Sequence, residues 1–410
     1  MNERVVITGI GMVTPLGAGK NVFSQRLFRG DSGISPITAF DTSRFRSRLG
    51  AEVRGFIPRE FISAKNLRRM DRISGMTAAS ARMAIEDAGF AIDASNRDRV
   101  GIILGVSYGS TEVAAQFAGI LFTEGPGMAS PILVPNTVIN APAGHTSIEL
   151  GFRGINSTVN HREASAETAI AYAAAEIKTG RADVLLAGGA DIISEIFFEI
   201  LTHFKAVSPV DGGAEGARPF DSLRNGPVIG EGAGVLCIES RTHARARGVT
   251  PYCEIAGWGL SSSPSPPTDW PSDPAGPILA MTRAIASAKI TPGDIDYVSA
   301  SANGGKKLDR LEAEALSAVF AEESQKPFIS SIKGAVGESF SSGGIRTAAM
   351  AISIREQTLP PTLGLNLPIK PLPFILNMKK EAGIHYGLVN GFSSGGTFAS
   401  IVLKRMDEQG

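Results

Sequence analysis

The sequence has no excess of charge of either sign, few cysteines and no long apolar run, and each absence excludes a class of protein. Lysine plus arginine equals aspartate plus glutamate at 40 each, so no overall field draws the chain to nucleic acid or to an anionic membrane. Cys237 and Cys253 are the two cysteines, both in apolar stretches, which indicates reduced buried thiols rather than a disulfide framework. No apolar run reaches the roughly 18 residues of a spanning helix, and no basic segment precedes an apolar one at the start. We therefore expect a cytoplasmic protein whose partners are small ligands and other proteins.

What is present is an alternation of short β-branched runs, often beside glycine, with alanine-rich stretches of helical spacing. The 410 residues, 43% of them hydrophobic, suit about two domains. The runs predict buried strands that meet tight turns at their glycines, at 5–8, 100–104, 184–187, 235–238, 252–256, 297–300, 328–331, 387–390 and 399–403. The helical spacing predicts helices at 76–88, 165–179, 277–289, 308–320 and 345–357. This order predicts an α/β fold with mostly parallel sheets covered by helices.

The order of elements repeats once along the chain. RVVITGIG opens the first half and the similar YCEIAGWG opens the second, with a charge-dense segment, RTHARARG, shortly before the second. We therefore predict two related halves, residues 1–248 and 249–410. Two proline-studded segments, 261–277 and 359–373, are expected to be a loop and an extended surface run, because proline cannot donate to a ladder.

Separated segments between Arg4 and Lys404 resemble the ketosynthase family of the thiolase fold, the decarboxylating condensing enzymes of fatty acid and polyketide synthesis. RVVITGIGMVTPLG resembles the family's opening strand, ARPFDSLRNGPVIGEGAG at 217–234 is similar to its RPFD…RDG…GEGAG segment, and NGFSSGGT at 390–397 resembles its terminal N-S-F-G-F-G-G-T. The resemblance implies a thiolase-like fold of duplicated α-β-α-β-α layers, with no cofactor and no metal. It also implies that the terminal glycines form part of an oxyanion hole; the alternative is that they only permit tight turns.

The family carries its acyl chain on a cysteine within T-A-C-A-S/T, ahead of a G-x-A-D…A-G-G strand. Here GRADVLLAGGAD at 180–191 fixes the register, and counting back places Glu163 on the cysteine position. A carboxylate carries an acyl group only as a reactive mixed anhydride, so thioester condensation is not expected. His161 lies nearby, and we interpret it as a local hydrogen-bond donor rather than a general base.

The two family histidines are replaced as well. In VSASANGGKKLDRLE the histidine position holds Ser301, while Asp309 and Glu312 keep their places. In SSIKGAVGESFSSGG the second histidine position holds Glu338, while Lys333 remains. The resemblance therefore assigns no catalytic residue but three changed positions, at Glu163, Ser301 and Glu338, and five former active-site neighbours, at Lys333, Glu312, Asp309, Phe392 and Ser394. We predict that Lys333 pairs with at least one of the glutamates that surround it.

Family members without the cysteine resemble the chain-length factor, or β subunit, of type II polyketide synthases. This implies a non-catalytic chain that pairs with an active ketosynthase across an interface built by the AGHTSIELG helix around His145. The growing acyl chain would then occupy a tunnel at that interface, lined by small residues at Thr111, Ala114, Ala115 and Ala118, which favours a long or linear polyene product. Close helix packing is an equal explanation of those alanines.

Two other functions remain open at this point. One is a divergent malonyl-carrier-protein decarboxylase, which an ionised Glu338 disfavours because it repels the enolate unless burial keeps it neutral. The other is a homodimeric acyl-binding scaffold. Acyl carrier protein is an expected partner, directly or through the ketosynthase, and the basic run KNLRRMDR at 65–72 is either its contact or a solvated face.

Overall fold

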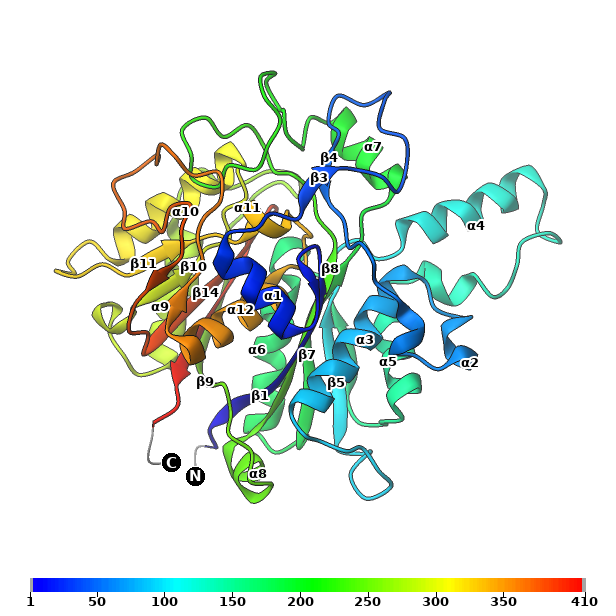
Figure 1. Ribbon diagram of the computed structural model, residues 1–410, viewed down its shortest axis with the longest axis horizontal. Helices are drawn as coiled ribbons and strands as arrows, with labels where there is room; N and C mark the ends of the chain where they lie inside the picture. The colour runs from blue at the N-terminus through cyan, green and yellow to red at the C-terminus, as the bar shows by residue number, and fades with distance from the viewer. Residues whose placement is uncertain (1–2, 408–410) are drawn as a thin grey trace.

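The computed structural model describes residues 3–407, which form one large mixed sheet, with helices between its two wings and on their outer sides (Figure 1). The strand order is β11-β10-β14-β15-β9-β1-β8-β7-β5-β6. Strands of the second half therefore form one stretch of the sheet and strands of the first half the other. The α/β thiolase-like fold predicted from the sequence is confirmed, whereas the boundary at residue 248 stays a prediction.

The strand bounds are β1 Val5–Thr14, β5 Val100–Gly105, β6 Asn156–Val159, β7 Val184–Asp191, β8 Gly232–Ser240, β9 Cys253–Ser262, β10 Tyr297–Ser299, β11 Phe328–Ser330, β14 Tyr386–Ser393 and β15 Thr397–Arg405. Short strand pairs lie beside them, with bounds β2 Gly17–Ala18 on β1, β3 Ile34–Pro36 with β4 Leu49–Ala51, and β12 Thr358–Leu359 with β13 Lys380–Glu381.

The sheet is less parallel than predicted. Strands β5, β6 and β7 are parallel to one another, as are β10, β11 and β14. The pairs β7–β8, β8–β1, β1–β9, β9–β15 and β15–β14 are antiparallel. Of these antiparallel pairs only β14–β15 is a direct hairpin, and the others bring together strands that are separated by helices or long loops in the chain.

Two helices, α6 (Ser165–Lys178) and α12 (Gly343–Glu356), contact each other and strands of both halves, so they form a middle layer. Helix α3 (Arg72–Asp87) packs on β1 and β8, while α9 (Ala275–Ser287) packs on β9 and β15. Helix α12 is buried along its length up to Ile354, as a layer between two wings of a sheet requires. The remaining helices are α1 Lys20–Arg29, α2 Ala64–Leu67, α4 Thr111–Thr123, α5 Ala141–Leu150, α7 Glu195–His203, α8 Arg241–Ala246, α10 Lys306–Val319 and α11 Lys333–Val336, with 3-10 turns η1 Pro58–Glu60, η2 Val134–Thr137, η3 Arg162–Ala164 and η4 Pro292–Asp294.

The glycines of the two repeated segments lie inside strands rather than in the turns predicted there. A Cβ atom on Gly11 of β1 would lie 1.9 Å from the Ser80 carbonyl oxygen of α3, and one on Gly259 of β9 would lie 2.1 Å from the Ala280 carbonyl oxygen of α9. Both strands therefore continue through their glycines, which let a helix approach the backbone. The same device in both halves supports the predicted duplication.

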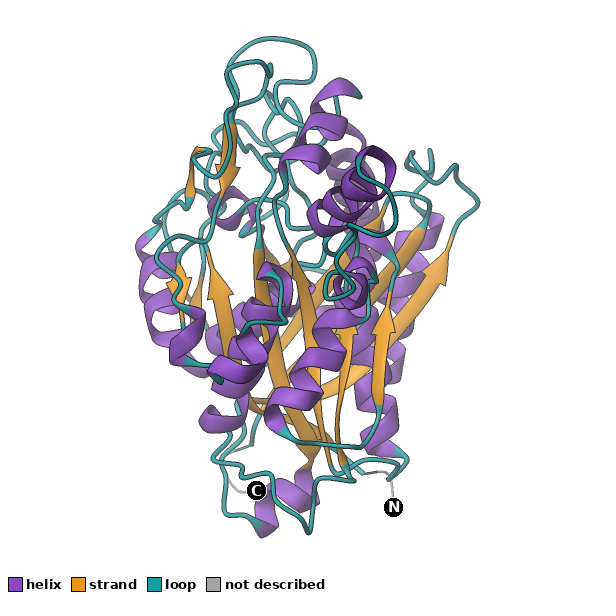
Figure 2. Cartoon of the chain, turned by 90° about the vertical axis from the view of Figure 1, so that its right-hand side faces the viewer, coloured by secondary structure: helices purple, strands orange, loops and turns teal. Residues whose placement is uncertain are grey.

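Long loops gather at the end of the molecule away from the two termini (Figure 2). In the part of the chain that the structure describes, no helix has both the length and the apolar character needed to cross a membrane.

Candidate functional site

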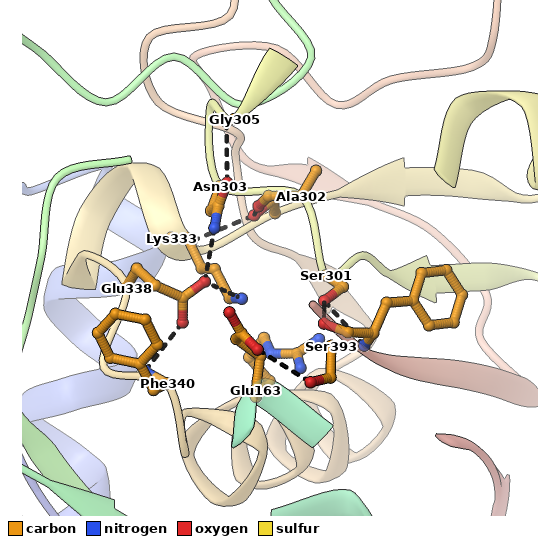
Figure 3. A network of polar contacts seen from close by, with 12 residues as sticks. Glu163, Ser301, Ala302, Asn303, Gly305, Lys333, Glu338, Phe340 and Ser393 are labelled. Atoms are coloured by element: carbon orange, nitrogen blue, oxygen red, sulfur yellow. Dashed lines mark hydrogen bonds and ion pairs between the residues drawn. The ribbon is translucent and has the colours of Figure 1, made fainter. Parts of the chain in front are cut away.

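Four segments meet at one end of the sheet and carry the residues singled out from the sequence (Figure 3). They are the turn η3 between β6 and α6, the loop after β10, the segment that contains α11, and the turn between β14 and β15. The carboxyl ends of β6, β10 and β11, which are parallel strands within their wings, face this site, the usual position of a ligand site in such sheets. Glu163, Ser301 and Glu338 therefore belong to one buried site.

Glu163 has its carboxyl group held by the turn that follows β14. The Ser393 hydroxyl donates to Glu163 Oε2 at 3.0 Å, and the Ser394 amide and hydroxyl donate to the same carboxyl at 3.2 Å. Burial raises the pKa of Glu163, and the nearby Glu338 raises it further. The carboxyl is therefore suited to hold a proton, and it points toward Lys333 and Glu338 (Figure 3).

Lys333 and Glu338 form a buried ion pair, with Lys333 Nζ 2.6 Å from Glu338 Oε2. Asn303 Nδ2 donates to the same oxygen at 2.8 Å, and the Phe340 amide donates to Glu338 Oε1 at 3.0 Å. The predicted pairing of Lys333 with a glutamate is confirmed at Glu338. The pair and its two added donors compensate the charge of Glu338, so the repulsion that the sequence suggested for an enolate is reduced.

Ser301 does not point a free hydroxyl into the site. Its Oγ accepts from the Phe392 amide at 3.1 Å, and its own amide donates to Glu312 Oε1 at 3.0 Å. Glu312 also accepts from the Ala302 amide and from Asn390 Nδ2, and burial raises its pKa. The Ser301 position thus joins the loop after β10 to the end of β14.

Asp309 is a buried acceptor beneath the loop after β10. It accepts from the amides of Phe220, Asn303 and Gly304, and burial raises its pKa to about 7. It therefore holds the loop that carries Asn303. Asp309, predicted as a former active-site neighbour, thus supports the loop after β10.

The glycine turn after Ser394 offers no free amide to an oxyanion. The Gly395 amide donates to the Asp269 carbonyl and the Gly396 amide donates to the Ser393 carbonyl. Both glycines have φ values above +80°, which a residue with a Cβ rarely adopts. The structure therefore favours the alternative given for these glycines, which is that they permit a tight turn rather than form part of an oxyanion hole.

Three aromatic rings cover the site on the side of α4 and α7. The rings of Tyr108 and Phe340 are 4.9 Å apart and those of Phe197 and Phe340 are 5.5 Å apart. Arg162, which has a φ of 52°, donates from Nη2 to the Tyr108 hydroxyl at 2.7 Å. We call Tyr108, Phe197 and Phe340 the aromatic cover. The aromatic cover lies beside the buried ion pair of the site, because the Phe340 amide donates to Glu338, which is 2% exposed.

The other predicted residues lie outside this network. Thr111 bonds to the Ser194 hydroxyl, and Ala114, Ala115 and Ala118 are half-buried on α4, which projects from the body (Figure 1). Their role as tunnel lining stays a prediction. His161 lies 3.4 Å from the Thr168 hydroxyl, which fits its interpretation as a local hydrogen-bond donor. His145 contacts Asn136, and its place in a partner interface stays a prediction.

The two thiols cannot replace the missing cysteine. Cys237 lies on β8 and Cys253 on β9, and both are fully buried in strands away from the site. Burial raises the pKa of Cys237 to about 12 and also raises that of Cys253. Neither thiol is therefore a nucleophile at neutral pH.

Sequence reasoning did not find Ser393, Asn303 or the aromatic cover. Ser393 lies 230 residues from Glu163 along the chain, so no local pattern joins them. The signal that could have found Ser393 is the pair of serines, Ser393 and Ser394, in the terminal segment NGFSSGGT, where two hydroxyls precede a glycine turn.

Comparison with known proteins gives the family. Residues 2–244 match the model of the beta-ketoacyl synthase N-terminal domain, and residues 252–366 match that of its C-terminal domain. The chain is 34% identical to 3-oxoacyl-[acyl-carrier-protein] synthase 2 of Coxiella burnetii, over 98% of this chain and 99% of that protein. It matches the structure of the ishigamide ketosynthase/chain length factor with a TM-score of 0.93 and 29% identity, over 99% of this chain and 100% of the other. A beta-ketoacyl synthase structure from Burkholderia phymatum gives a TM-score of 0.91 and 30% identity with the same coverage.

These matches correct the function predicted from the sequence. Further relatives with the name 3-oxoacyl-[acyl-carrier-protein] synthase 2 are 30–33% identical over almost the whole chain, and that name describes catalytic synthases. The prediction of a non-catalytic chain-length factor is therefore wrong, and these names support neither alternative. The name of the ishigamide protein includes both a ketosynthase and a chain length factor, so that match favours neither. The prediction rested on three changed positions, whereas the function of this chain has to be argued from the whole site that its residues form.

Proposed function

We propose, on the premise that this chain belongs to the beta-ketoacyl synthase family, that it takes part in making 3-oxoacyl thioesters on acyl carrier protein without forming an acyl-enzyme. The observation that carries this proposal is the buried Glu163 carboxyl, held by Ser393 and Ser394 where the family resemblance places the acyl-carrying thiol. The names of the full-length relatives support the reaction class. The carboxyl supports proton transfer in place of covalent acyl transfer.

The reaction joins two thioesters bound at the same time. A malonyl thioester loses carbon dioxide and keeps the electron pair as an enolate. The enolate carbon attacks the carbonyl carbon of the acyl thioester, so a carbon–carbon bond forms and the carbon–sulfur bond of that thioester breaks. Glu163 gives its proton to the departing thiolate, and water later returns a proton to the carboxylate. The raised pKa of Glu163 keeps that proton available.

The residues around Glu163 have separate roles. Lys333 has ammonium hydrogens beyond the one that bonds Glu338, and these stabilise the enolate oxygen as charge develops there. Glu338 holds Lys333 in place, and Asn303 in turn holds Glu338. The Ser393 and Ser394 hydroxyls orient the Glu163 carboxyl.

The test uses purified chain with carbon-13-labelled malonyl carrier protein and octanoyl carrier protein. We expect a labelled 3-oxoacyl product, an unmodified mass for the chain, and initial-rate lines that intersect because both substrates bind before a product leaves. The same assay is run with the chain paired to a ketosynthase whose cysteine has been replaced, so that any product comes from this chain's site. A mass gain of one acyl group, or no product in either form, would overturn the proposal.

A second part of the proposal concerns the partner. We define residues 111–150 as the arm. It carries exposed apolar side chains, among them Phe122 at 84% and Ile148 at 66% exposed, and its helix α5 contacts the edge strand β6. Large exposed apolar patches mark interaction sites, and an edge strand can accept another strand. We infer that an active ketosynthase subunit covers the arm and β6 to make a heterodimer. The predicted tunnel lining at Thr111, Ala114, Ala115 and Ala118 lies within the same arm and belongs to this proposal.

Co-expression with ketosynthases from neighbouring genes, followed by light scattering on a sizing column, tests the pairing. We expect a heterodimer, and Phe122→Asp with Ile148→Asp is expected to weaken it at least 10-fold because buried charges without partners oppose association. Met378→Asp is the matched control, since Met378 is equally exposed but lies outside the arm. Persistence of a homodimer beside every candidate, or an unchanged heterodimer in the double variant, contradicts this part.

A further inference from the structure

Beneath the site, Arg346 of α12 and Glu167 of α6 form an ion pair in which both side chains are 0% exposed. The guanidinium group also donates from Nη1 to two backbone carbonyls, those of Ala300 and Asn390. Arg346 is the largest of the fully buried side chains in the described residues. One group therefore joins three segments of the chain that are far apart in sequence.

Each of the three segments carries a residue of the site. Ala300 directly precedes Ser301, and Asn390 lies three residues before Ser393 on β14. Glu167 lies in the first turn of α6, four residues after Glu163, which lies in the turn η3 immediately before that helix. A shift of Arg346 would therefore move the supports of Glu163 and of Ser393 relative to each other.

Two glycines confine the Glu167 carboxyl from both sides. A Cβ atom on Gly343 would lie 2.2 Å from Glu167 Cδ, and one on Gly391 would lie 2.4 Å from it. Gly343 begins α12 and Gly391 lies on β14, so the carboxyl is wedged between the same elements that Arg346 joins. The orientation of the pair is thus fixed by packing as well as by hydrogen bonds.

The pair is poorly suited to a purely stabilising role. Glu167 Oε2 and Arg346 Nε have no hydrogen-bond partner among the described residues. A buried polar atom without a partner opposes folding, and replacing a buried ion pair by apolar residues is often neutral or stabilising. We therefore look for the role of this pair in the segments that it joins, which are α6, the loop after β10 and β14.

We propose that Arg346 and Glu167 are positioning residues that set the separation between the Glu163 carboxyl and the hydroxyls of Ser393 and Ser394. The predicted loss of turnover rests on the proposed function, whereas the predicted change in the surroundings of the Glu163 carboxyl does not. The two are measured separately, so that failure of one can be told from failure of the other.

The geometric readout is the infrared absorption of the Glu163 carboxyl, at the carbonyl stretch when it holds a proton and at the carboxylate stretches when it does not, isolated as the difference between the wild-type chain and Glu163→Gln. We call this signal the Glu163 band. The test variant is Arg346→Met with Glu167→Leu, which fills the space and removes the buried charges but leaves the Ala300 and Asn390 carbonyls without their donor. We expect a folded chain with a lowered melting temperature, because two buried carbonyls lose their donor, and a shifted Glu163 band. With turnover, we expect a kcat about 100-fold lower at unchanged KM, because an ångström of misplacement can cost that much. Arg346→Lys, which keeps the charge without the fork of donors, is expected to shift the band as well.

Arg247→Met is the control, since Arg247 pairs with the buried Glu239 on β8 away from the site. We expect it to lower the melting temperature and to leave the band and kcat unchanged. If the double variant keeps the wild-type band, the pair is only structural and the inference fails, whatever the turnover. If the band shifts but the wild-type chain has no turnover, the proposed function fails and the positioning role stands.

Discussion

Replacing Lys333 by methionine is expected to lower the free energy of unfolding by about 3–5 kcal/mol, the usual cost of leaving one member of a buried ion pair without the other. Lys333 is 1% exposed and Glu338 is 2% exposed, so water cannot replace the lost ammonium group. Asn303 and the Phe340 amide remain as donors to Glu338. They are neutral, so they cannot supply the missing positive charge. Urea unfolding followed by circular dichroism measures the change.

Two further variants make the Lys333 experiment specific. Lys306→Met removes a lysine from an ion pair with Asp211 in which both side chains are more than half exposed, and its cost is expected to stay within about 0.5 kcal/mol. Lys333→Met with Glu338→Leu removes both charges and is expected to recover most of the loss, as apolar replacements of buried pairs do. A Lys333→Met chain as stable as the Lys306→Met chain contradicts the compensation described for the site.

The second large effect is expected from Glu163→Gln, which keeps the shape of the side chain and removes its proton. The rate of 3-oxoacyl formation is expected to fall about 100-fold, since a positioned proton donor contributes at least that much. Binding of the thioesters is expected to change little, because the amide oxygen still accepts from Ser393 and Ser394. Steady-state kinetics with saturating carrier-protein substrates measures the effect.

The pH dependence gives the same variant a second signature. Burial places the pKa of Glu163 above its ordinary value of 4.5. Between these two values the folded chain binds a proton that the unfolded chain has released, so the free energy of unfolding falls as pH rises through that interval. Glu163→Gln lacks this fall, so its stability relative to the wild type is expected to increase as pH rises, while the wild-type rate declines above the raised pKa. Parallel stability curves for the two chains would speak against a protonated Glu163.

The sequence predicts the local parts of this site better than its long-range parts. Lys333 and Glu338 are five residues apart, so their pairing could be predicted. Glu163 could be predicted from the register that the strand at 180–191 fixes. Ser393 meets Glu163 across 230 residues, and such a contact depends on how α6 packs against β14. Hydrophobic periodicity says which face of an element is buried but not which partner it meets.

Arg346 shows a signal that sequence reasoning passed over. It stands alone among small and apolar residues in GGIRTAAMAISI, and Glu167 stands alone in ASAETAIAYAAA. A single charge on an apolar helix needs a partner when that helix is buried, so two such helices predict each other's pairing. The fold class was predictable because strand and helix alternation is local, whereas the antiparallel centre of the sheet depends on which strands become neighbours.

The edge strand β6 also bears on how the chain is handled in a cell. In the heterodimer proposed above, any copies made in excess of the partner would leave the backbone groups of β6 and the apolar arm open to other strands, including those of unfinished chains. Balanced synthesis of the two chains, or removal of the surplus by proteases, would then decide how much assembled protein accumulates.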